Sequence, residues 1–317
     1  MAHTDPINGK FVTLFGGTGF LGNYVAQALL ARGARLRIAS RHPEKSFSLK
    51  PLANLGQLQF ARVDITQERS VAAAIHGADV VINLVGSFEG NLRKLMGEAA
   101  GTMAQIASEQ GVRAFVQISA IGADAQSETD YASAKALGEQ LVSQNFPNAT
   151  IIRPSIIFGK DDAFINMFAR LIQLSPVLPV FAPDAKMQMA YVGDVAEAIA
   201  QAAASPGKHG GKTYELAGPE AVTMLDLNRR IAAAQGRSRQ FIPMPDAASA
   251  TFAALPLTPL GRDQWALLKQ GNTPTGDYPG FEKFGIEPRP LGLFIDKWMV
   301  RYRKHGRFGT KGLQVAG

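Results

Sequence analysis

Residues 14–22 read Leu-Phe-Gly-Gly-Thr-Gly-Phe-Leu-Gly, a glycine-rich turn that follows an apolar run and precedes a helical pattern. Each glycine meets a separate need: Gly16 permits a sharp turn, Gly19 removes Cβ beside a phosphate, and Gly22 allows close packing of helix on strand. The helix N-terminus adds unpaired N–H groups and the positive end of its dipole. A turn that only connects two elements is the alternative, but the strand before it and the helix after it favour a dinucleotide site.

The first half of the chain alternates short apolar runs with helical segments, which predicts βαβ units and a parallel sheet. Six strands are expected, at 11–15, 36–39, 58–63, 80–85, 115–118 and 150–152. Helices are expected between them, at 19–32, 70–75, 92–110 and 131–144. This order predicts an α/β fold with a Rossmann-type, doubly wound parallel sheet.

The second half of the chain is less regular. A proline-rich stretch is followed by an expected helix at 194–204 and an expected strand at 213–217. We therefore predict an NAD(P)-binding Rossmann core and a smaller, interleaved C-terminal region for a substrate or partner. The core is expected at 1–158, with 190–217 returning to it, the smaller region at 159–189 and 218–308, and a flexible tail at 309–317.

Composition limits the possible chemistry. The 317 residues are 46% hydrophobic, enough for a substantial core, and include no cysteine, which excludes disulfides, thiolate metal sites and thiol nucleophiles. No apolar run approaches the roughly twenty residues that span a bilayer, and the first six residues lack a secretory signal. We expect no transmembrane segment and a cytoplasmic or matrix-type compartment.

The chain is basic, with a formal net charge of +7. Such a charge attracts phosphates, acidic lipids or an acidic partner, and it also occurs in soluble proteins that bind none of these. No nucleic-acid module is present, and the five histidines lack metal-ligand spacing, so we expect neither nucleic acid nor metal. The neighbouring acids Asp161 and Asp162 either form a carboxylate pair or, as we expect for adjacent residues on a loop, are solvated or capping.

The end of the second strand selects the cofactor, since an acid there binds the ribose 2′-hydroxyl whereas a cation accommodates a 2′-phosphate. Residues 40–43 read Ser-Arg-His-Pro, without an acid. The planar guanidinium of Arg41 can clamp a phosphate and Ser40 can donate a further hydrogen bond. A solvated surface arginine is the alternative. We predict NADPH rather than NAD(H).

Two more strand ends offer cofactor contacts, because ligands of open α/β sheets gather there. Asp64, followed by Ile65, either accepts a hydrogen bond from the adenine amino group or caps the next turn. Leu84, Val85 and Gly86 end the fourth strand with small and apolar residues, against which the cofactor is expected to lie.

Tyr131 and Lys135 are the chain's single Tyr-x-x-x-Lys pair, and four-residue spacing places both on one face of a helix. A neighbouring ammonium favours the phenolate, so we expect Lys135 to lower the pKa of Tyr131 toward a value useful for proton transfer. The pair is the candidate catalytic group.

The glycine turn, Asp64, the Tyr131 and Lys135 pair, and Arg153-Pro154 leading to Phe158-Gly159 together resemble the extended or atypical short-chain dehydrogenase/reductases. The resemblance covers nearly the whole chain. It implies further cofactor contacts from Thr18, Phe20, Leu21, Pro154, Ser155 and Ile156.

Reductases of this wider family place a Ser or Thr near the end of the fifth strand to hold the substrate carbonyl. Ser119 is the only hydroxyl in residues 117–123, one or two positions early. It either serves that role or bonds the cofactor or the backbone.

A narrower resemblance rests on Asn54-Leu55-Gly56-Gln57-Leu58, residues 80–84, Ile157-Phe158-Gly159, residues 191–195 and Phe284-Gly285-Ile286. These look like the nucleotide-binding accessory subunit of respiratory complex I and its bacterial relatives. That resemblance implies NADPH held tightly as a structural element, and complex I subunits as partners.

The segment 291–307 carries apolar residues at helical spacing and a basic opposite face with Lys297, Arg301, Arg303, Lys304 and Arg307. Such a helix either meets an anionic membrane surface or an acidic partner, or it docks on its own fold with a solvated basic face. In the first case the protein would be peripheral on the inner membrane.

Two hypotheses remain open from the sequence. One is an accessory protein of a respiratory complex that holds its cofactor without turnover. The other is a free-standing NADPH-dependent reductase or epimerase of a small carbonyl or sugar-type substrate. We prefer the first, because of the motifs of the narrower resemblance and the early position of Ser119; fold alone supports neither.

Overall fold

The computed structural model describes residues 5–246, 262–304 and 306. The chain divides into two compact units. Unit 1 contains Met1–Ile157, Val192–Ala217 and Pro274–Glu287, and unit 2 contains Phe158–Tyr191, Gly218–Thr273 and Pro288–Gly317. Residues 274–287, which we expected in the smaller region, therefore belong to unit 1. The tail expected at 309–317 lies outside the described residues.

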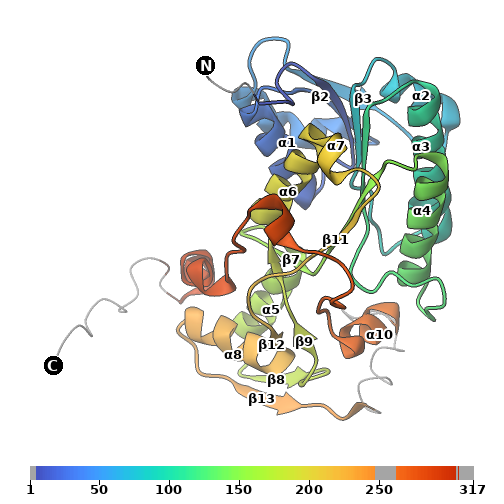
Figure 1. The fold of residues 1–317 in the computed structure, drawn as a ribbon. Coiled ribbons are helices and arrows are strands. Elements are labelled where there is room, and N and C mark those ends of the chain that lie inside the picture. Colours follow the sequence, from blue (N-terminus) through green and yellow to red (C-terminus); the bar gives the residue numbers. More distant parts are fainter. Residues whose placement is uncertain (1–4, 247–261, 305, 307–317) are drawn as a thin grey trace. The chain divides into compact units, whose positions relative to one another are not determined.

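Unit 1 is built on a seven-stranded parallel sheet with the order β11-β6-β5-β4-β1-β2-β3, as the sequence predicted for a Rossmann-type fold (Figure 1). The strands are β1 (Phe11–Phe15), β2 (Arg35–Ser40), β3 (Leu58–Arg62), β4 (Val80–Asn83), β5 (Ala114–Ile118), β6 (Thr150–Pro154) and β11 (Thr213–Leu216). Strands β4 and β5 are buried along their whole length. Helices on both faces of the sheet explain their continuous apolar character.

The helices of unit 1 form two groups. Helices α1 (Phe20–Ala31) and α6 (Val192–Ala204) pack together on one side of the sheet (Figure 1). Helices α2 (Glu68–Ile75), α3 (Ala99–Glu109) and α4 (Asp130–Asn145) lie on the other. The short helices are η1 (Pro43–Leu52), α7 (Pro206–His209) and η3 (Phe281–Phe284).

The helix expected at 92–110 begins instead as a π-helical stretch, η2 (Arg93–Glu98), which continues into α3. Gly97 lies so close to α4 that an added Cβ would meet the Leu137 side chain at 2.6 Å. Helix α4 begins at Thr129, whose side chain accepts a hydrogen bond from the Ala132 N–H. This cap explains where the helix that carries Tyr131 and Lys135 starts.

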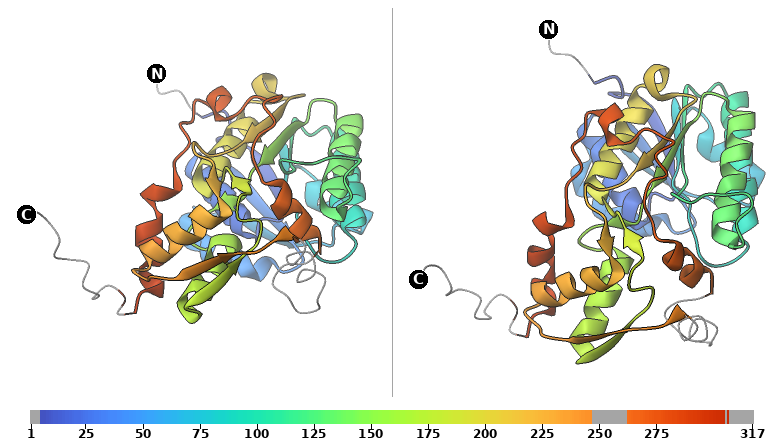
Figure 2. Two further views of the ribbon diagram at one scale, coloured as in Figure 1. Left: turned by 90° about the horizontal axis from the view of Figure 1, so that it is seen from below. Right: turned by 60° about the horizontal axis from the view of Figure 1, so that its bottom comes forward.

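Unit 2 contains α5 (Ala163–Leu174), α8 (Met224–Ala234) and α10 (Arg262–Gln270) (Figure 2). Strand β8 (Val177–Val180) pairs in parallel with β13 (Gln240–Pro243), and β9 (Lys186–Met187) pairs antiparallel with β12 (Val222–Thr223). The first segment of this unit starts within β7 (Ile157–Phe158) and ends with β10 (Ala190–Tyr191).

Asp162 caps helix α5, as expected. Its carboxylate accepts hydrogen bonds from the Ile165 N–H at 2.6 Å and the Gly159 N–H at 3.1 Å. Burial nevertheless raises the pKa of this carboxyl above its usual value. Asp161 instead pairs with Arg301 at 3.2 Å. The two acids thus have structural contacts and do not act as a carboxylate pair.

The C-terminal segment is not the continuous helix that its spacing predicted. It consists of three short turns: η4 (Leu291–Leu293), α11 (Ile295–Trp298) and η5 (Met299–Tyr302). The backbone departs from helical geometry at Phe294, whose ring stacks on Tyr191 at 4.2 Å and on Trp298 at 4.9 Å. Ring packing within unit 2 therefore outweighs the regular helical hydrogen bonds here.

Two of the five cations expected on a solvated face are engaged within unit 2. Arg301 bonds to Asp161 and Asn166, and Arg303 donates to the Ala234 carbonyl at 3.0 Å. Arg307 lies outside the described residues, whereas Lys297 and Lys304 are exposed. In the part of the chain that the structure describes, no helix has the length and apolar character needed to cross a membrane.

Candidate functional site

The glycine turn follows β1, where the winding of the sheet reverses between β1 and β4. Gly16 has a positive φ of 75°, and a Cβ there would lie 3.1 Å from the Leu84 carbonyl carbon. A Cβ on Gly22 would lie 2.6 Å from the Gly16 oxygen and from Gly17 Cα. Only glycine fits these two positions without a backbone shift.

The N-terminus of α1 faces this turn without a side-chain cap. Gly19 is the N-cap residue and, having no side chain, does not cap the first turn, which Phe20 and Leu21 begin. These backbone N–H groups therefore remain suited to an anion, and the helix dipole adds attraction. The arrangement fits the pyrophosphate of a dinucleotide.

At the end of β2, Ser40 lies beside the turn. Its hydroxyl is 2.9 Å from the Thr18 hydroxyl and also accepts from the His42 N–H at 3.2 Å. Arg41 is exposed, and within the described residues it makes no hydrogen bond or ion pair. An uncommitted guanidinium at this strand end is what a 2′-phosphate requires.

The Arg41→Asp substitution tests this assignment. We expect NADPH affinity to fall about tenfold while NADH affinity does not fall, since a charge-assisted hydrogen bond to phosphate contributes roughly 1.5–3 kcal/mol, exposure weakens it, and an acid at this position can accept from the ribose 2′-hydroxyl of NADH. Fluorescence titration with both cofactors measures the ratio. Arg69→Asp, an exposed arginine of α2, is the matched control. An unchanged ratio in Arg41→Asp would identify a solvated surface arginine.

At the end of β3, Asp64 caps the following turn. Its carboxylate oxygen Oδ1 accepts from the Thr66 N–H at 2.9 Å and the Thr66 hydroxyl at 2.8 Å. These hydrogen bonds lower the pKa of Asp64, with a smaller contribution from the charge of Arg41. The carboxylate is exposed, so the cap occupies one oxygen without burying the group. Ile65 packs against the core beside it.

The end of β4 is tied to α4 by a lysine. The Lys135 ammonium donates to the Val85 carbonyl at 3.2 Å and to the Ile118 carbonyl at 3.0 Å. A Cβ on Gly86 would lie 3.8 Å from the same nitrogen. Lys135 therefore joins the ends of β4 and β5, and two of its three N–H donors are used by described residues.

The expected effect of Lys135 on Tyr131 is wrong in direction. Burial raises the pKa of Tyr131 to about 12, and burial lowers the pKa of Lys135 to about 8, partly offset by the charge of Glu139. The ammonium lies 6.0 Å from the Tyr131 ring centroid and bonds to carbonyls. Desolvation thus outweighs the charge effect that the spacing suggested.

Ser119 follows β5 and is buried. Its N–H donates to the Ile152 carbonyl at 2.8 Å, but its hydroxyl has no hydrogen-bond partner among the described residues. A buried hydroxyl without a partner is costly unless a ligand or water satisfies it. This orphaned atom is the second feature that fits a bound cofactor.

Pro154 is the last residue of β6, and Ser155 and Ile156 follow it. Pro154 and Ser155 are buried and Ile156 is half-buried. The Ser155 N–H donates to the Leu216 carbonyl at 2.9 Å, and the Pro154 carbonyl accepts from the Ile121 N–H at 3.1 Å. Backbone hydrogen bonds thus hold this stretch at the carboxyl ends of the strands, where Ser119 also lies.

A buried ionic cluster next to this edge was not predicted. Arg153 of β6 binds both oxygens of Glu139 at 2.8 and 2.7 Å and lies 3.7 Å from Glu215 of β11. Glu215 in turn accepts from the N–H and hydroxyl of Thr275, and Tyr278 covers the guanidinium at 4.7 Å. Two signals were available: Glu139 lies four residues after Lys135, and Glu215 is an acid inside a strand with buried neighbours.

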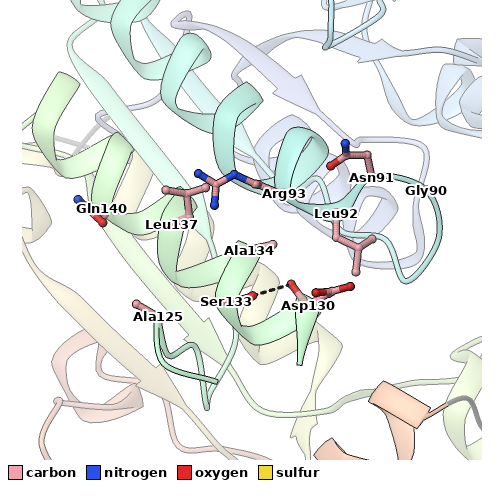
Figure 3. A pocket seen from close by; sticks show the side chains of 10 residues that line it. All are labelled: Gly90, Asn91, Leu92, Arg93, Ala125, Asp130, Ser133, Ala134, Leu137 and Gln140. Atoms are coloured by element: carbon pink, nitrogen blue, oxygen red, sulfur yellow. Dashed lines mark hydrogen bonds between the residues drawn. The ribbon is translucent and has the colours of Figure 1, made fainter. Parts of the chain in front are cut away.

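The pocket in Figure 3 is separate from these residues. It has a volume of about 520 Å³ and lies between the beginning of η2 and helix α4. Asn91, Asp130 and Ser133 contribute polar groups, and the Ser133 hydroxyl donates to the Asp130 carbonyl. None of the expected cofactor residues lines it. In the described part of the chain, no group of three or more potential metal ligands occurs.

Comparison with known proteins agrees with this geometry. A family model described as NAD(P)H-binding matches residues 16–206. The mitochondrial NADH dehydrogenase [ubiquinone] 1 alpha subcomplex subunit 9 of Rattus norvegicus is 31% identical over 315 residues, covering 95% of this chain and 82% of that protein. The ceramide reductase of Caulobacter vibrioides is 28% identical, covering 83% of this chain and 80% of the reductase.

Among solved structures, an NADPH-dependent quinone oxidoreductase from Escherichia coli, complexed with NADPH, has the same fold. The TM-score is 0.73 at 21% identity, and the match covers 90% of this chain and 99% of that one.

Proposed function

The chain belongs to the NAD(P)H-binding family and to the family of alpha subcomplex subunit 9 of mitochondrial NADH dehydrogenase, and from this premise we propose that it holds NADPH as a structural element of a respiratory NADH:quinone oxidoreductase. The observation that carries the proposal is the 31% identity to that subunit across 95% of the chain. Both units are included in this match, so it is not limited to the nucleotide-binding fold.

The residues at the sheet edge divide naturally among the parts of a dinucleotide. The turn from Gly16 to Leu21, with Thr18 and Gly19, would hold the pyrophosphate, Ser40 and Arg41 the 2′-phosphate, and Asp64 with Ile65 the adenine. The nicotinamide side would meet Leu84, Val85, Gly86, Ser119, Tyr131, Lys135, Pro154, Ser155 and Ile156. Bound NADPH would supply a hydride. These residues would bind and orient the cofactor and exclude water from it.

A free-standing reductase is the second candidate. Tyr131 and Lys135 lie on one helix as such an enzyme requires, and the ceramide reductase of Caulobacter vibrioides is among the relatives. Against this candidate, Tyr131 carries a pKa raised to about 12 by burial, which makes it a weak proton donor at neutral pH.

We propose protein subunits rather than lipid as the partner of the C-terminal segment. An amphipathic membrane helix needs one continuous apolar face. Here the segment is broken into three turns, and its apolar residues Leu291, Ile295 and Tyr302 are buried within unit 2. A matrix-type or cytoplasmic location, peripheral on the inner membrane through the complex, would follow from this partner.

One purification tests the proposal. The tagged chain is recovered from its native membranes in mild detergent, its partners are identified by mass spectrometry, and its nucleotide is released by denaturation and quantified. We expect NADH:quinone oxidoreductase subunits to copurify, with stoichiometric NADPH that survives dialysis and is not oxidised by a panel of carbonyl compounds.

A different outcome would support the reductase instead. Recovery of a partner-free protein that oxidises NADPH, with activity abolished in Tyr131→Phe, would replace the structural role by the reductase. The Tyr24→Phe variant is the matched control, because Tyr24 lies on α1 rather than α4.

A further inference from the structure

The ring of Tyr131 is covered by another ring. Phe88 stacks on it with 4.5 Å between centroids and an angle of 14° between planes. Although Phe88 makes this contact, it remains 52% exposed, so its outer face meets solvent. Phe88 is therefore placed between solvent and one face of the phenol.

Phe88 is presented by a short loop between β4 and η2. Gly86 and Gly90 flank it, and Gly90 has a positive φ of 82°. The Ser87 hydroxyl donates to the Glu89 carbonyl at 2.9 Å and accepts from the Glu89 N–H at 3.0 Å. This turn fixes the backbone on both sides of Phe88, so the ring position is built into the loop.

Tyr131 is half-buried and also packs against the protein core. Leu92, Met96 and Ala134 form a buried cluster, against which Tyr131 and Leu95 pack. Phe88 is thus an exposed part of the cover of Tyr131. Burial raises the pKa of the Tyr131 phenol.

We infer that Phe88 decides what reaches Tyr131: its ring takes the place in which a planar carbonyl substrate would have to lie, and so keeps the tyrosine from reacting. This inference rests on the proposed function, because it gives the reason why a bound cofactor is held without turnover. General acid catalysis needs the phenol within about 3 Å of the substrate oxygen, and a stacked ring occupies the approach.

Removal of the ring should restore the reaction. With Phe88→Ala, a planar aromatic aldehyde can occupy the vacated face. Its carbonyl carbon accepts a hydride from NADPH and its oxygen accepts the proton of the Tyr131 phenol, giving the alcohol and NADP⁺. The phenolate regains its proton from water, so the reaction consumes one proton from solution.

The first test needs no cofactor. Tyrosinate formation is followed by ultraviolet absorbance during alkaline titration of wild type and Phe88→Ala, each with and without Tyr131→Phe. We expect the step assigned to Tyr131 to move down by about one to two pH units in Phe88→Ala. The Phe47→Ala variant is the matched control, since Phe47 is also half-exposed and packs on another ring, that of Phe60 at 4.9 Å.

The second test is NADPH oxidation with 4-nitrobenzaldehyde. We expect at least a roughly tenfold gain in rate in Phe88→Ala, no gain in Phe47→Ala, and loss of the gain in Phe88→Ala/Tyr131→Phe. An unchanged Tyr131 titration in Phe88→Ala, or equal rates in wild type and Phe88→Ala, would overturn the inference. The Tyr131 titration can be measured whether or not respiratory subunits copurify with the protein. Failure of this inference can therefore be distinguished from failure of the proposed function.

Discussion

The Arg153→Met variant is expected to lose about 3–5 kcal/mol of its free energy of unfolding. Arg153 is the shared partner of Glu139 and Glu215, whose side chains are 12% and 0% exposed. Its hydrogen bonds to Glu139 raise the pKa of Arg153 further above its usual value, so the guanidinium stays charged. Methionine fills similar space but leaves two buried carboxylates without their shared cation.

Urea unfolding measures this loss, with Arg230→Met as the matched control. Arg230 also binds two acids, Glu220 at 2.9 Å and Asp226 at 2.7 Å, but it is 39% exposed. Solvent screening limits its loss to about 1 kcal/mol or less. Similar losses in both variants would show that the cluster is not effectively buried.

A double substitution separates the effect of the lost charge of Arg153 from the effect of its lost packing. In the background of Glu139→Gln and Glu215→Gln, Arg153→Met no longer leaves buried carboxylates without Arg153. The further loss in free energy of unfolding should therefore be well below the loss in wild type. An equal cost in both backgrounds would assign the effect to lost packing, including the contact of Arg153 with Tyr278.

The Gly22→Ala variant is expected to weaken NADPH binding by roughly 10- to 100-fold. The new Cβ would lie 2.6 Å from the Gly16 oxygen and from Gly17 Cα, both backbone atoms of the turn. They cannot rotate away, so the turn itself must shift. Overpacking of this kind costs about 1–3 kcal/mol, which appears as lost affinity because the turn is the proposed phosphate cradle.

Calorimetric titration with NADPH measures the effect. Gly207→Ala is the matched control, because Gly207 also lies in a helix but has nothing within 4 Å of its added Cβ. Its affinity should equal that of wild type. If Gly22→Ala binds NADPH as tightly as Gly207→Ala, the cofactor does not lie against this turn.

The sheet was predictable from the sequence because its signals are local. Strand β1 was expected at its observed bounds, and β2 and β5 within one residue at each end. Apolar runs with helical segments between them are sufficient to specify a parallel, doubly wound order. The prediction of a continuous C-terminal helix was wrong, although the helical spacing of its apolar residues is present. Contacts among the rings of Phe294, Trp298 and Tyr191, which local spacing does not report, accompany its division into three short turns.

The candidate site was predictable only in part. The glycine turn, Ser40, Arg41 and Lys135 could be located because each follows a strand or shares a helix face. The Arg153 cluster could not, since it joins residues from four separate segments. The expected direction of the Tyr131 pKa shift was wrong because desolvation depends on what covers a side chain, and no local pattern reports that.

By itself, the sequence determined the Rossmann-type sheet, the glycine turn at its edge and the family, because propensity, periodicity and glycine spacing act over a few neighbouring residues. The tertiary structure alone decided what surrounds Tyr131. Phe88 reaches it from a loop 43 positions earlier in the chain, and the Lys135 ammonium turns to two carbonyls instead. Burial and charge are sums over everything nearby in space, so they exist only once the chain has folded.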